Sequence, residues 1–462
     1  ETPEEAAPPH AGTVHPRVAG LEVQERDIPT NPRSSAPNSK KSRAVTHKAG
    51  RGAAGHQPPP PGRDWFSAVF GFSETDGETA TRHLAVNANN DELRSKANGR
   101  VIAIGKFRTP SVHDLRKIHT EHWAPMLESQ RWAPISPDGS EQTRLKMRVV
   151  VGDVASLHMS PAYRNATFQV ASQFNCLEFC VPDMLPEDGI TCYGHDHTQG
   201  PACSIACGGA TAYRNYFVRS EEGLGHGGSE RGQTEHLQIN NIKALLEKIG
   251  EKLGWEHGTH GPVRVHNGYT FASDENLAHV SEMLRGLGEC EWEDLRRHLC
   301  VGVHSDVEVT QQGSDPTEPW RGYAGQRVTQ VFASACSVSY SGNRDMWLWE
   351  RLSRMVLEGA YEATLLAAAA QCCEKRAEEA MPGGEKAYAA NTVVLTLLGG
   401  GVFGNHIEWI TDAIKRACLM PEVAGMDLDV VINSYSPHIP PEVKECVDSV
   451  NRALSHRTEA QP

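Results

Sequence analysis

The residues with the clearest chemical potential form a glycine-rich turn near the end of the chain. An apolar stretch at 393–398 stops at three consecutive glycines, and a helical pattern begins at residue 408. Glycine lets a backbone approach a ligand closely, and successive N–H groups beside a helix N-terminus can hold a phosphate. A tight strand-to-helix turn without a ligand is the alternative. We expect the contacting residues to be Gly399, Gly400, Gly401, Val402, Phe403, Gly404 and Asn405.

A second polar cluster occupies residues 193–217 and combines acid, imidazole, hydroxyl, amide and guanidinium groups. Within it, Thr198, Gln199 and Gly200 precede a proline, which is typical of a turn that opens a helix. The small residues of 202–212 would form that helix, and its first N–H groups would face a ligand. Arg214 is suited to bidentate pairing with a phosphate. A polar network that braces a buried helix start remains an equally open alternative.

The cysteines and histidines of the same region raise the possibility of a metal site. Cys176 and Cys180 are four residues apart, as are Cys203 and Cys207, and His195 and His197 lie near them. Zinc sites more often use closer cysteine pairs around a turn. Small neighbours around the second pair suit buried packing instead. We therefore predict no metal ion and no cofactor, and we keep a zinc-dependent hydrolase as an alternative.

Strands and helices must position these segments. Apolar periodicity predicts helices at 347–370 and 408–419. Short apolar runs predict strands at 100–107, 147–151, 167–171, 300–309, 328–335, 393–398 and 428–432. Alternating strands and helices imply an α/β protein, a three-layer sandwich with a mixed, mainly parallel sheet covered on both faces. Ligands of such sheets bind beyond the carboxyl ends of the strands, where the glycine turn falls.

Composition suggests how the chain is divided. Residues 1–62 are rich in Pro, Ala, Gly and Ser, which predicts disorder because little apolar surface can be buried. Residues 63–145 read as an ordered N-terminal extension, in which 111–118 is a short helix with a serine N-cap. The α/β domain spans 146–440, with a polar insertion or lid at about 220–295, and 441–462 are a C-terminal tail.

The bulk charge limits the partners. A net charge of -13 over 462 residues argues against direct nucleic-acid binding, which depends on Lys and Arg. A small phosphate held by backbone N–H groups needs no such charge. No apolar run is long enough to span a membrane, no signal core is visible, and the 12 cysteines are scattered. These features favour an intracellular protein, cytoplasmic or nuclear. The N-terminal tail has no assigned role, and binding of a protein partner is one open possibility.

Two motifs, taken in their order along the chain, resemble macrodomains and the related poly(ADP-ribose) glycohydrolases. In that family a strand leads into a glycine-rich loop with an apolar-aromatic-Gly element and then a helix, and segment 395–417 is similar to this. Upstream, Val-Val-Val-Gly-Asp-Val at 149–154 precedes a strand that leads to Asn175, as in the opening strands of the family. The resemblance implies a macrodomain-like fold that binds ADP-ribose or a related nucleotide diphosphate.

The resemblance also implies roles for individual residues. The glycine-rich loop would wrap the diphosphate and the distal ribose. Asp153 would accept a hydrogen bond from the adenine amino group, and Asn175 would contact the distal ribose, with Gln173 beside it. Apart from the resemblance, the residues themselves offer Glu178 or Asp196 to orient a water for attack on a glycosidic carbon, since that chemistry uses a positioned carboxylate.

The sequence departs from the family pattern directly after Asn175. Cys-Leu-Glu-Phe at 176–179 stands where the family has a glycine-rich run, and the paired glutamates of the glycohydrolases are not visible. Binding with hydrolysis of an ADP-ribosyl linkage is therefore one hypothesis. A non-catalytic scaffold or complex subunit that retains the fold is the second, and the zinc-dependent hydrolase is the third.

Overall fold

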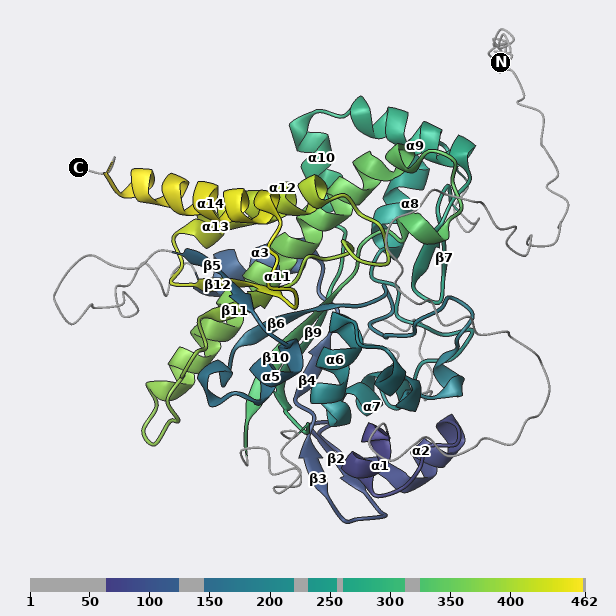
Figure 1. Ribbon diagram of the computed structural model, residues 1–462, viewed down its shortest axis with the longest axis vertical. Helices are drawn as coiled ribbons and strands as arrows, with labels where there is room; N and C mark the ends of the chain where they lie inside the picture. Colours follow the sequence, from purple (N-terminus) through teal and green to yellow (C-terminus); the bar gives the residue numbers. More distant parts are fainter. Residues whose placement is uncertain (1–63, 124–144, 220–231, 256–260, 312–324, 460–462) are drawn as a thin grey trace, which may run out of the picture. The chain divides into compact units, whose positions relative to one another are not determined.

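The computed structural model describes residues 64–123, 145–219, 232–255, 261–311 and 325–459 (Figure 1). The segment predicted to be disordered, 1–62, lies outside these ranges, as does part of the predicted insertion at 220–295. Within the described ranges, no helix has both the length and the apolar composition needed to cross a membrane.

A seven-stranded sheet forms the centre of the molecule. Its order is β4 (Lys106–Arg108), β9 (Gly302–Glu308), β10 (Arg327–Ala333), β6 (Thr167–Ala171), β11 (Thr392–Leu395), β12 (Asp429–Ser434) and β5 (Lys146–Val151). The five strands from β10 to β5 are parallel, whereas β9 is antiparallel to both of its neighbours. The predicted fold class, α/β with a mixed and mainly parallel sheet, is confirmed. The carboxyl ends of the parallel strands therefore meet at one edge.

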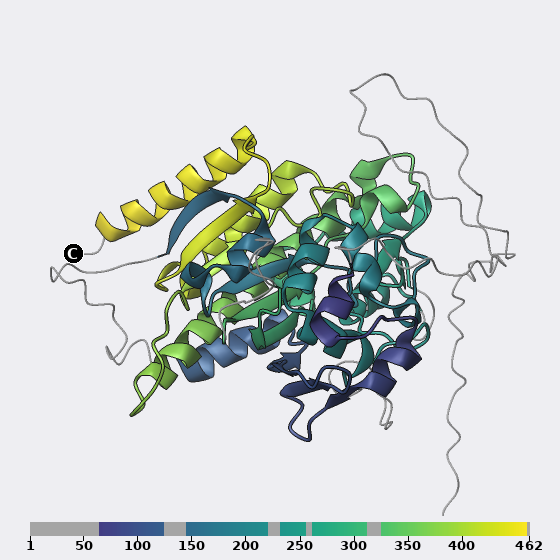
Figure 2. The same ribbon diagram turned by 60° about the horizontal axis from the view of Figure 1, so that its bottom comes forward.

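The central strands are buried on both faces because their side chains alternate between two cores. In β11, Val393 and Leu395 belong to the core beneath α11 (Glu350–Glu379) and α12 (Ile407–Cys418). Val394 faces the opposite core, which includes residues of α6 (Gln199–Ala206) and α7 (Gly208–Tyr216). The two layers of helices can be followed in Figures 1 and 2. Helix α14 (Pro441–Glu459), from the predicted C-terminal tail, packs against α12 and β5.

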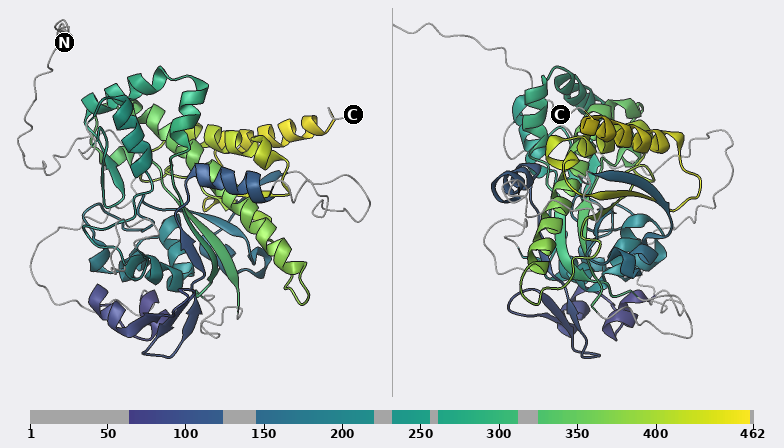
Figure 3. Two further views of the ribbon diagram at one scale, coloured as in Figure 1. Left: turned by 180° about the vertical axis from the view of Figure 1, so that it is seen from behind. Right: turned by 90° about the vertical axis from the view of Figure 1, so that its left-hand side faces the viewer.

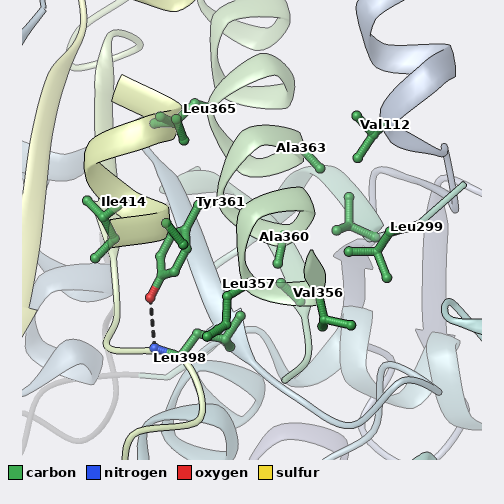
Figure 4. Packing of buried hydrophobic residues seen from close by; sticks show 14 of the residues in the cluster. Val112, Leu299, Val356, Leu357, Ala360, Tyr361, Ala363, Leu365, Leu398 and Ile414 are labelled. Atoms are coloured by element: carbon green, nitrogen blue, oxygen red, sulfur yellow. Dashed lines mark hydrogen bonds between the residues drawn. The ribbon is translucent and has the colours of Figure 1, made fainter. Parts of the chain in front are cut away.

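The long helix α11 is the main support of the sheet. The prediction of 347–370 was close, but the helix begins three residues later, after a 3₁₀ turn, and runs on through a charged segment to Glu379. Its Tyr361 hydroxyl donates to the Thr396 carbonyl at 2.7 Å and accepts from the Leu398 N–H at 2.9 Å. Figure 4 shows this side chain among the buried residues of the first core. The hydroxyl therefore fixes the chain where it leaves β11.

Two predicted elements are each divided in two by a contact with a residue that is distant in the sequence. The strand expected at 100–107 is split into β3 (Val101–Ala103) and β4 at Gly105, which has a φ of 61°. A Cβ at Gly105 would lie 1.9 Å from the Ser305 carbonyl oxygen, so only glycine fits. The helix expected at 202–212 is split at Cys207. There the Gly208 N–H donates to the Thr310 hydroxyl instead of continuing the helix.

The first described residues form a small unit on the α7 side. Helix α1 (Trp65–Phe70) packs on α7, and α2 (Gly77–His83) follows it. Strands β1 (Leu84–Val86), β2 (Glu92–Ser95) and β3 form an antiparallel sheet. The predicted helix with a serine cap is confirmed as α3 (Val112–Ile118), whose Ser111 forms a capping box with Asp114.

Residues 232–255 and 261–296 form a further group of elements, whose last two helices pack against α11 (Figure 3). They form α8 (Lys243–Lys252), the hairpin of β7 (Arg264–His266) and β8 (Tyr269–Phe271), α9 (Asp274–Arg285) and α10 (Glu289–Arg296). The shorter elements elsewhere are α5 (Val154–Met159), α13 (Pro421–Ala424), the π-helical turn η1 (His119–Trp123) and the 3₁₀ turns η2 (Pro161–Tyr163), η3 (Pro186–Asp188), η4 (Thr191–His195), η6 (Val338–Tyr340) and η7 (Met346–Trp349).

An ionic cluster joins four helices in this region. Arg116 of α3, Arg296 of α10 and Arg416 of α12 all contact the carboxylate of Glu362 on α11. Glu362 is fully buried, and Glu293 of α10 pairs with the same three arginines. Several arginines around each carboxylate compensate the cost of burial. The cluster therefore holds α3, α10, α11 and α12 together.

Candidate ligand-binding and active site

A cavity of about 880 Å³, including its open mouth, lies at the carboxyl ends of β6, β10 and β11. Its walls come from the segment after β6, the start of α6, the turn after β11 and the hairpin β7–β8. The lining residues are Ala171, Ser172, Gln173, Glu178, Phe179, Cys180, Asp196, Thr198, Gln199, Gly200, Pro201, Tyr269, Ala335, Tyr340, Thr396, Leu397, Leu398, Gly399, Gly401, Val402 and Phe403. The position is the one expected for ligands of open parallel sheets.

The glycine turn forms one wall, and its shape depends on two glycines with positive φ. Gly399 has a φ of 73°, and a Cβ there would lie 2.5 Å from the Cβ of Ala335. Gly404 has a φ of 75°, and a Cβ there would lie 2.1 Å from the Ser339 hydroxyl oxygen. L-residues rarely adopt this backbone conformation. The glycines therefore let the turn pack tightly against the segment that follows β10.

The same turn contains three consecutive backbone donors that bind no acceptor among the described residues. The Gly400 N–H donates to the Leu397 carbonyl, and the Gly404 N–H donates to the Gly401 carbonyl. Within the described part of the chain, the N–H groups of Gly401, Val402 and Phe403 have no acceptor. All three residues line the cavity. Consecutive free amides of this kind form an anion-binding concavity.

At the same cavity, the loop after β6 carries the carboxyl group of Glu178. The Gln173 side chain closes the loop because its Nε2 donates to the Phe179 carbonyl at 2.9 Å and its Oε1 accepts from the Phe179 N–H at 3.1 Å. Tyr269 of β8 also donates to the Phe179 carbonyl, at 2.6 Å. Cys176, in the middle of the loop, has a φ of 61°. The clamp and the tight turn place Glu178 at the cavity wall.

Glu178 is a buried acid without a full set of partners. It is only 3% exposed, and its Oε1 has no hydrogen-bond partner among the described residues. Burial raises the pKa of its carboxyl well above the ordinary value of 4.5; the charge of Arg214 opposes this rise and Asp196 adds to it. An orphaned carboxyl with a raised pKa that lines a cavity is suited to proton transfer.

The start of α6 supports Glu178 from the side. A Cβ at Gly200 would lie 2.0 Å from the Ala171 carbonyl oxygen and 2.2 Å from Oε2 of Glu178. Gln199 extends the edge of β6, since its Oε1 accepts from the Ala171 N–H and its Nε2 donates to the Gln169 carbonyl. Glycine at position 200 is therefore required for the carboxyl to lie where it does.

Most of the residues predicted from the sequence meet at this cavity. They are Gln173, Glu178, Asp196, Thr198, Gln199, Gly200, Gly399, Gly401, Val402 and Phe403. The amides of Gln173 and Gln199 are nevertheless bound to the protein, as described above. Asp196 uses one oxygen to accept from the Thr198 N–H at 2.8 Å. The site therefore offers a ligand mainly backbone N–H groups and two carboxyl groups.

Asp153 and Asn175 do not line the cavity. Asp153 follows β5, two strands beyond β11, and its side chain caps α5 by accepting from the Ala155 N–H at 3.1 Å. Asn175 is fully buried and donates to Gln238 at 2.9 Å, while its Oδ1 accepts from the Leu177 N–H. Asn175 thus differs from the expectation of a ribose contact because its amide holds the loop of Glu178 instead.

Arg214 also differs from its expected place. The sequence suggested a phosphate contact, but the side chain is fully buried and lies 3.7 Å above the ring of Phe332. Its guanidinium donates to groups of the protein interior. Gly400, Gly404 and Asn405 are also absent from the cavity wall. They shape the turn, for example through the bond from the Asn405 side chain to the Cys336 carbonyl at 2.8 Å.

Two tyrosines of the cavity wall were not predicted from the sequence. Tyr269 belongs to the hairpin β7–β8, and Tyr340 lies in η6 with its ring 5.0 Å from that of Tyr269. The signal for the hairpin was the Asn267-Gly268 pair, whose φ values of 46° and 77° are those of a two-residue turn. No comparable local signal marks Tyr340. Among the described residues, no group of three His, Cys, Asp or Glu side chains is placed to hold a metal ion.

Comparison with known proteins gives limited likenesses. No protein-family model matches the chain. A stretch of 171 residues, 37% of this chain, is 26% identical to the RNA-directed RNA polymerase lambda-3 of reovirus type 3 (strain Dearing). The chain spans 11% of the length of that curated relative.

Among solved structures, the chain is similar to poly(ADP-ribose) glycohydrolases. The enzyme from Thermomonospora curvata has 15% identity and a TM-score of 0.34, with 81% of this chain and 95% of that chain covered. The enzyme from Deinococcus radiodurans in complex with ADP-ribose has 12% identity and a TM-score of 0.33, covering 76% and 94%. These neighbours carry the family name that the sequence motifs suggested.

Proposed function

We propose that the cavity binds ADP-ribose or a related nucleotide diphosphate. The observation that carries the proposal is the pairing, across one cavity, of two features. Residues 401–403, whose consecutive N–H groups have no acceptor among the described residues, line the cavity, and so does Glu178, whose Oε1 has no described partner. Backbone amides suit a diphosphate in a chain whose net charge is -13, because they attract an anion without side-chain cations.

The neighbouring strand ends supply groups suited to a base. Tyr435, directly after β12, is 82% exposed. Val151, at the end of β5, pairs with Ser434, so Asp153 and Tyr435 follow adjacent strands at the same edge. An exposed aromatic ring can stack on adenine, and a carboxylate can accept from its amino group. We assign the adenine end of the ligand to this side and the distal ribose to the side of Glu178.

For catalysis, we propose hydrolysis of an ADP-ribosyl linkage with Glu178 as the acid. Glu178 would donate its proton to the leaving oxygen as the bond from that oxygen to the anomeric carbon breaks. Water would then add to the anomeric carbon and return one proton to the Glu178 carboxylate. Asp196, at the same cavity, is the second carboxyl group available to orient that water. Burial raises the pKa of Glu178 above its ordinary value, which is the direction that a proton donor requires.

Titration calorimetry of the full chain tests the binding proposal. ADP-ribose is expected to bind, and AMP or ribose 5-phosphate alone is expected to bind at least about tenfold more weakly, since each lacks part of the diphosphate and one end of the ligand. No heat and no thermal shift at millimolar ADP-ribose would overturn the proposal. Binding without release of ADP-ribose from an ADP-ribosylated substrate would instead favour the non-catalytic scaffold.

A further inference from the structure

Arg214 is a buried cation that has no ion-pair partner in contact. The residue is fully buried in α7, and its guanidinium stacks on Phe332. Within the described ranges, no carboxylate oxygen lies within 4.0 Å of it, although the other fully buried arginine, Arg296, has three such contacts. Burial of an unpaired charge is costly, and arginine does not escape that cost by losing its proton. The energetic cost of burying the unpaired charge of Arg214 indicates that this residue has a function.

Neutral groups satisfy the hydrogen bonds of Arg214 without cancelling its charge. Nε donates to the Cys176 carbonyl at 3.2 Å, and one terminal nitrogen donates to the Ser204 and Thr211 hydroxyls at 3.3 and 3.1 Å. The other terminal nitrogen lies 3.3 Å from Nδ1 of His304. Burial and the charge of Arg214 hold the pKa of His304 well below 6.5, so its ring is neutral.

The geometry connects Arg214 to Glu178 through two elements. The Cys176 carbonyl that it binds is two residues before Glu178, in the tight turn of the loop. The Ser204 hydroxyl belongs to α6, the helix whose Gly200 lies against Oε2 of Glu178. Arg214 therefore ties together the two segments that enclose the orphaned carboxyl.

We propose that Arg214 is the positioning residue of the candidate site: it holds the turn that carries Glu178 and supplies the fixed positive charge beside that carboxyl. The inference rests on the proposed function, because a role for Glu178 in proton transfer gives the arginine its purpose. It goes beyond that function because it assigns control of the ionisation of Glu178 to a residue outside the cavity wall.

The ionisable groups around Glu178 agree with this role. Burial and Asp196 both raise the pKa of Glu178, and Arg214 is the only group among its described neighbours that lowers it. Besides His304, five other titratable groups of the surrounding elements interact with Glu178 or Arg214, and burial raises the pKa of each so that it is neutral: Cys176, Tyr193, Cys203, Cys207 and Tyr269. Without Arg214, no cation of the described residues would favour the ionised form of Glu178 that must exist after proton donation.

Carbon-13 NMR of glutamate-labelled protein follows the ionisation of Glu178 directly, with Glu178→Gln identifying its carboxyl signal. In Arg214→Met, which removes the charge at similar length, the titration midpoint is expected to rise by about 1 pH unit or more. In Arg214→Lys, which keeps a charge, it is expected to remain much closer to that of the wild type. An unchanged midpoint in a folded Arg214→Met protein would overturn the inference.

A second measurement covers the case in which Arg214→Met does not fold. Arg214→Lys loses the planar fork, so the amide resonances of Leu177 and Glu178 are expected to shift while those of α14 do not. Unchanged resonances at both residues would overturn the positioning role. Neither measurement uses a ligand. Failure of ADP-ribose binding alone would therefore count against the proposed function, whereas failure of these shifts counts against Arg214.

Discussion

Replacement of Glu178 by glutamine is expected to stabilise the protein increasingly as pH rises. A carboxyl with a raised pKa stays protonated in the folded state at pH values where it ionises in the unfolded chain. The folded state therefore loses stability as pH rises from 4.5, the ordinary value, toward the folded-state pKa of Glu178. Glutamine cannot ionise and escapes this loss.

The size of the effect follows from proton linkage. Each pH unit in that window costs the wild type about 1.4 kcal/mol. Because the unfolding entropy grows with chain length, a protein of this size gains roughly 1 °C in Tm per kcal/mol. The difference in Tm between Glu178→Gln and the wild type is thus expected to grow by about 1 to 2 °C per pH unit.

Differential scanning calorimetry between pH 4 and pH 8 is the assay. Glu282→Gln is the matched control, since Glu282 is exposed on α9 and does not line the cavity. The control is expected to run parallel to the wild type at every pH. A difference for Glu178→Gln that does not change with pH, or that falls as pH rises, would refute the raised pKa and with it the role of Glu178 as an acid.

Three further predictions concern separate parts of the molecule. Gly200→Ala is expected to lower stability by about 1–3 kcal/mol in urea unfolding, because its Cβ would lie 2.0 Å from the Ala171 carbonyl oxygen; unchanged stability would contradict that close approach. The arginines around Glu293 hold its pKa at about 2 although burial opposes them, so that its share of the stability is lost as pH falls from 4.5 to about 2. In Glu293→Gln, the free energy of unfolding is therefore expected to fall less between pH 4.5 and about pH 2 than in the wild type. An equal fall in both proteins, measured in acid unfolding curves, would refute the assignment. Tyr435→Ala is expected to weaken ADP-ribose binding in calorimetry about tenfold with little change in Tm, because its ring is 82% exposed, and unaltered affinity would remove it from the site.

Local sequence patterns were sufficient for the sheet and for the glycine turn. An apolar β-branched run followed by glycines and an amphipathic helix carries its own signals, and β11 and α12 lie where those signals predicted. The splits at Gly105 and Cys207 could not be predicted. They depend on contacts with Ser305 and Thr310, which are distant in sequence.

The roles of the polar side chains were harder to predict than their location. Gln173, Gln199 and Asn175 lie at or beside the site, yet their amides hold the backbone of neighbouring segments. A sequence shows that an amide follows a strand, but it does not show whether the acceptor is a ligand or a carbonyl of the same loop. The same limit applies to Arg214, which a phosphate and a buried turn would suit equally well.

The most direct test of the account places a negative charge on the proposed diphosphate cradle. Gly401 lines the cavity, and a Cβ there would meet nothing within 4 Å, so that Gly401→Asp is expected to fold normally. Calorimetry is expected to show ADP-ribose binding about tenfold or more weaker in Gly401→Asp, and close to the wild type in its neutral counterpart Gly401→Asn. Equal affinities in Gly401→Asp and the wild type would contradict the claim that the amides of 401–403 hold the phosphates.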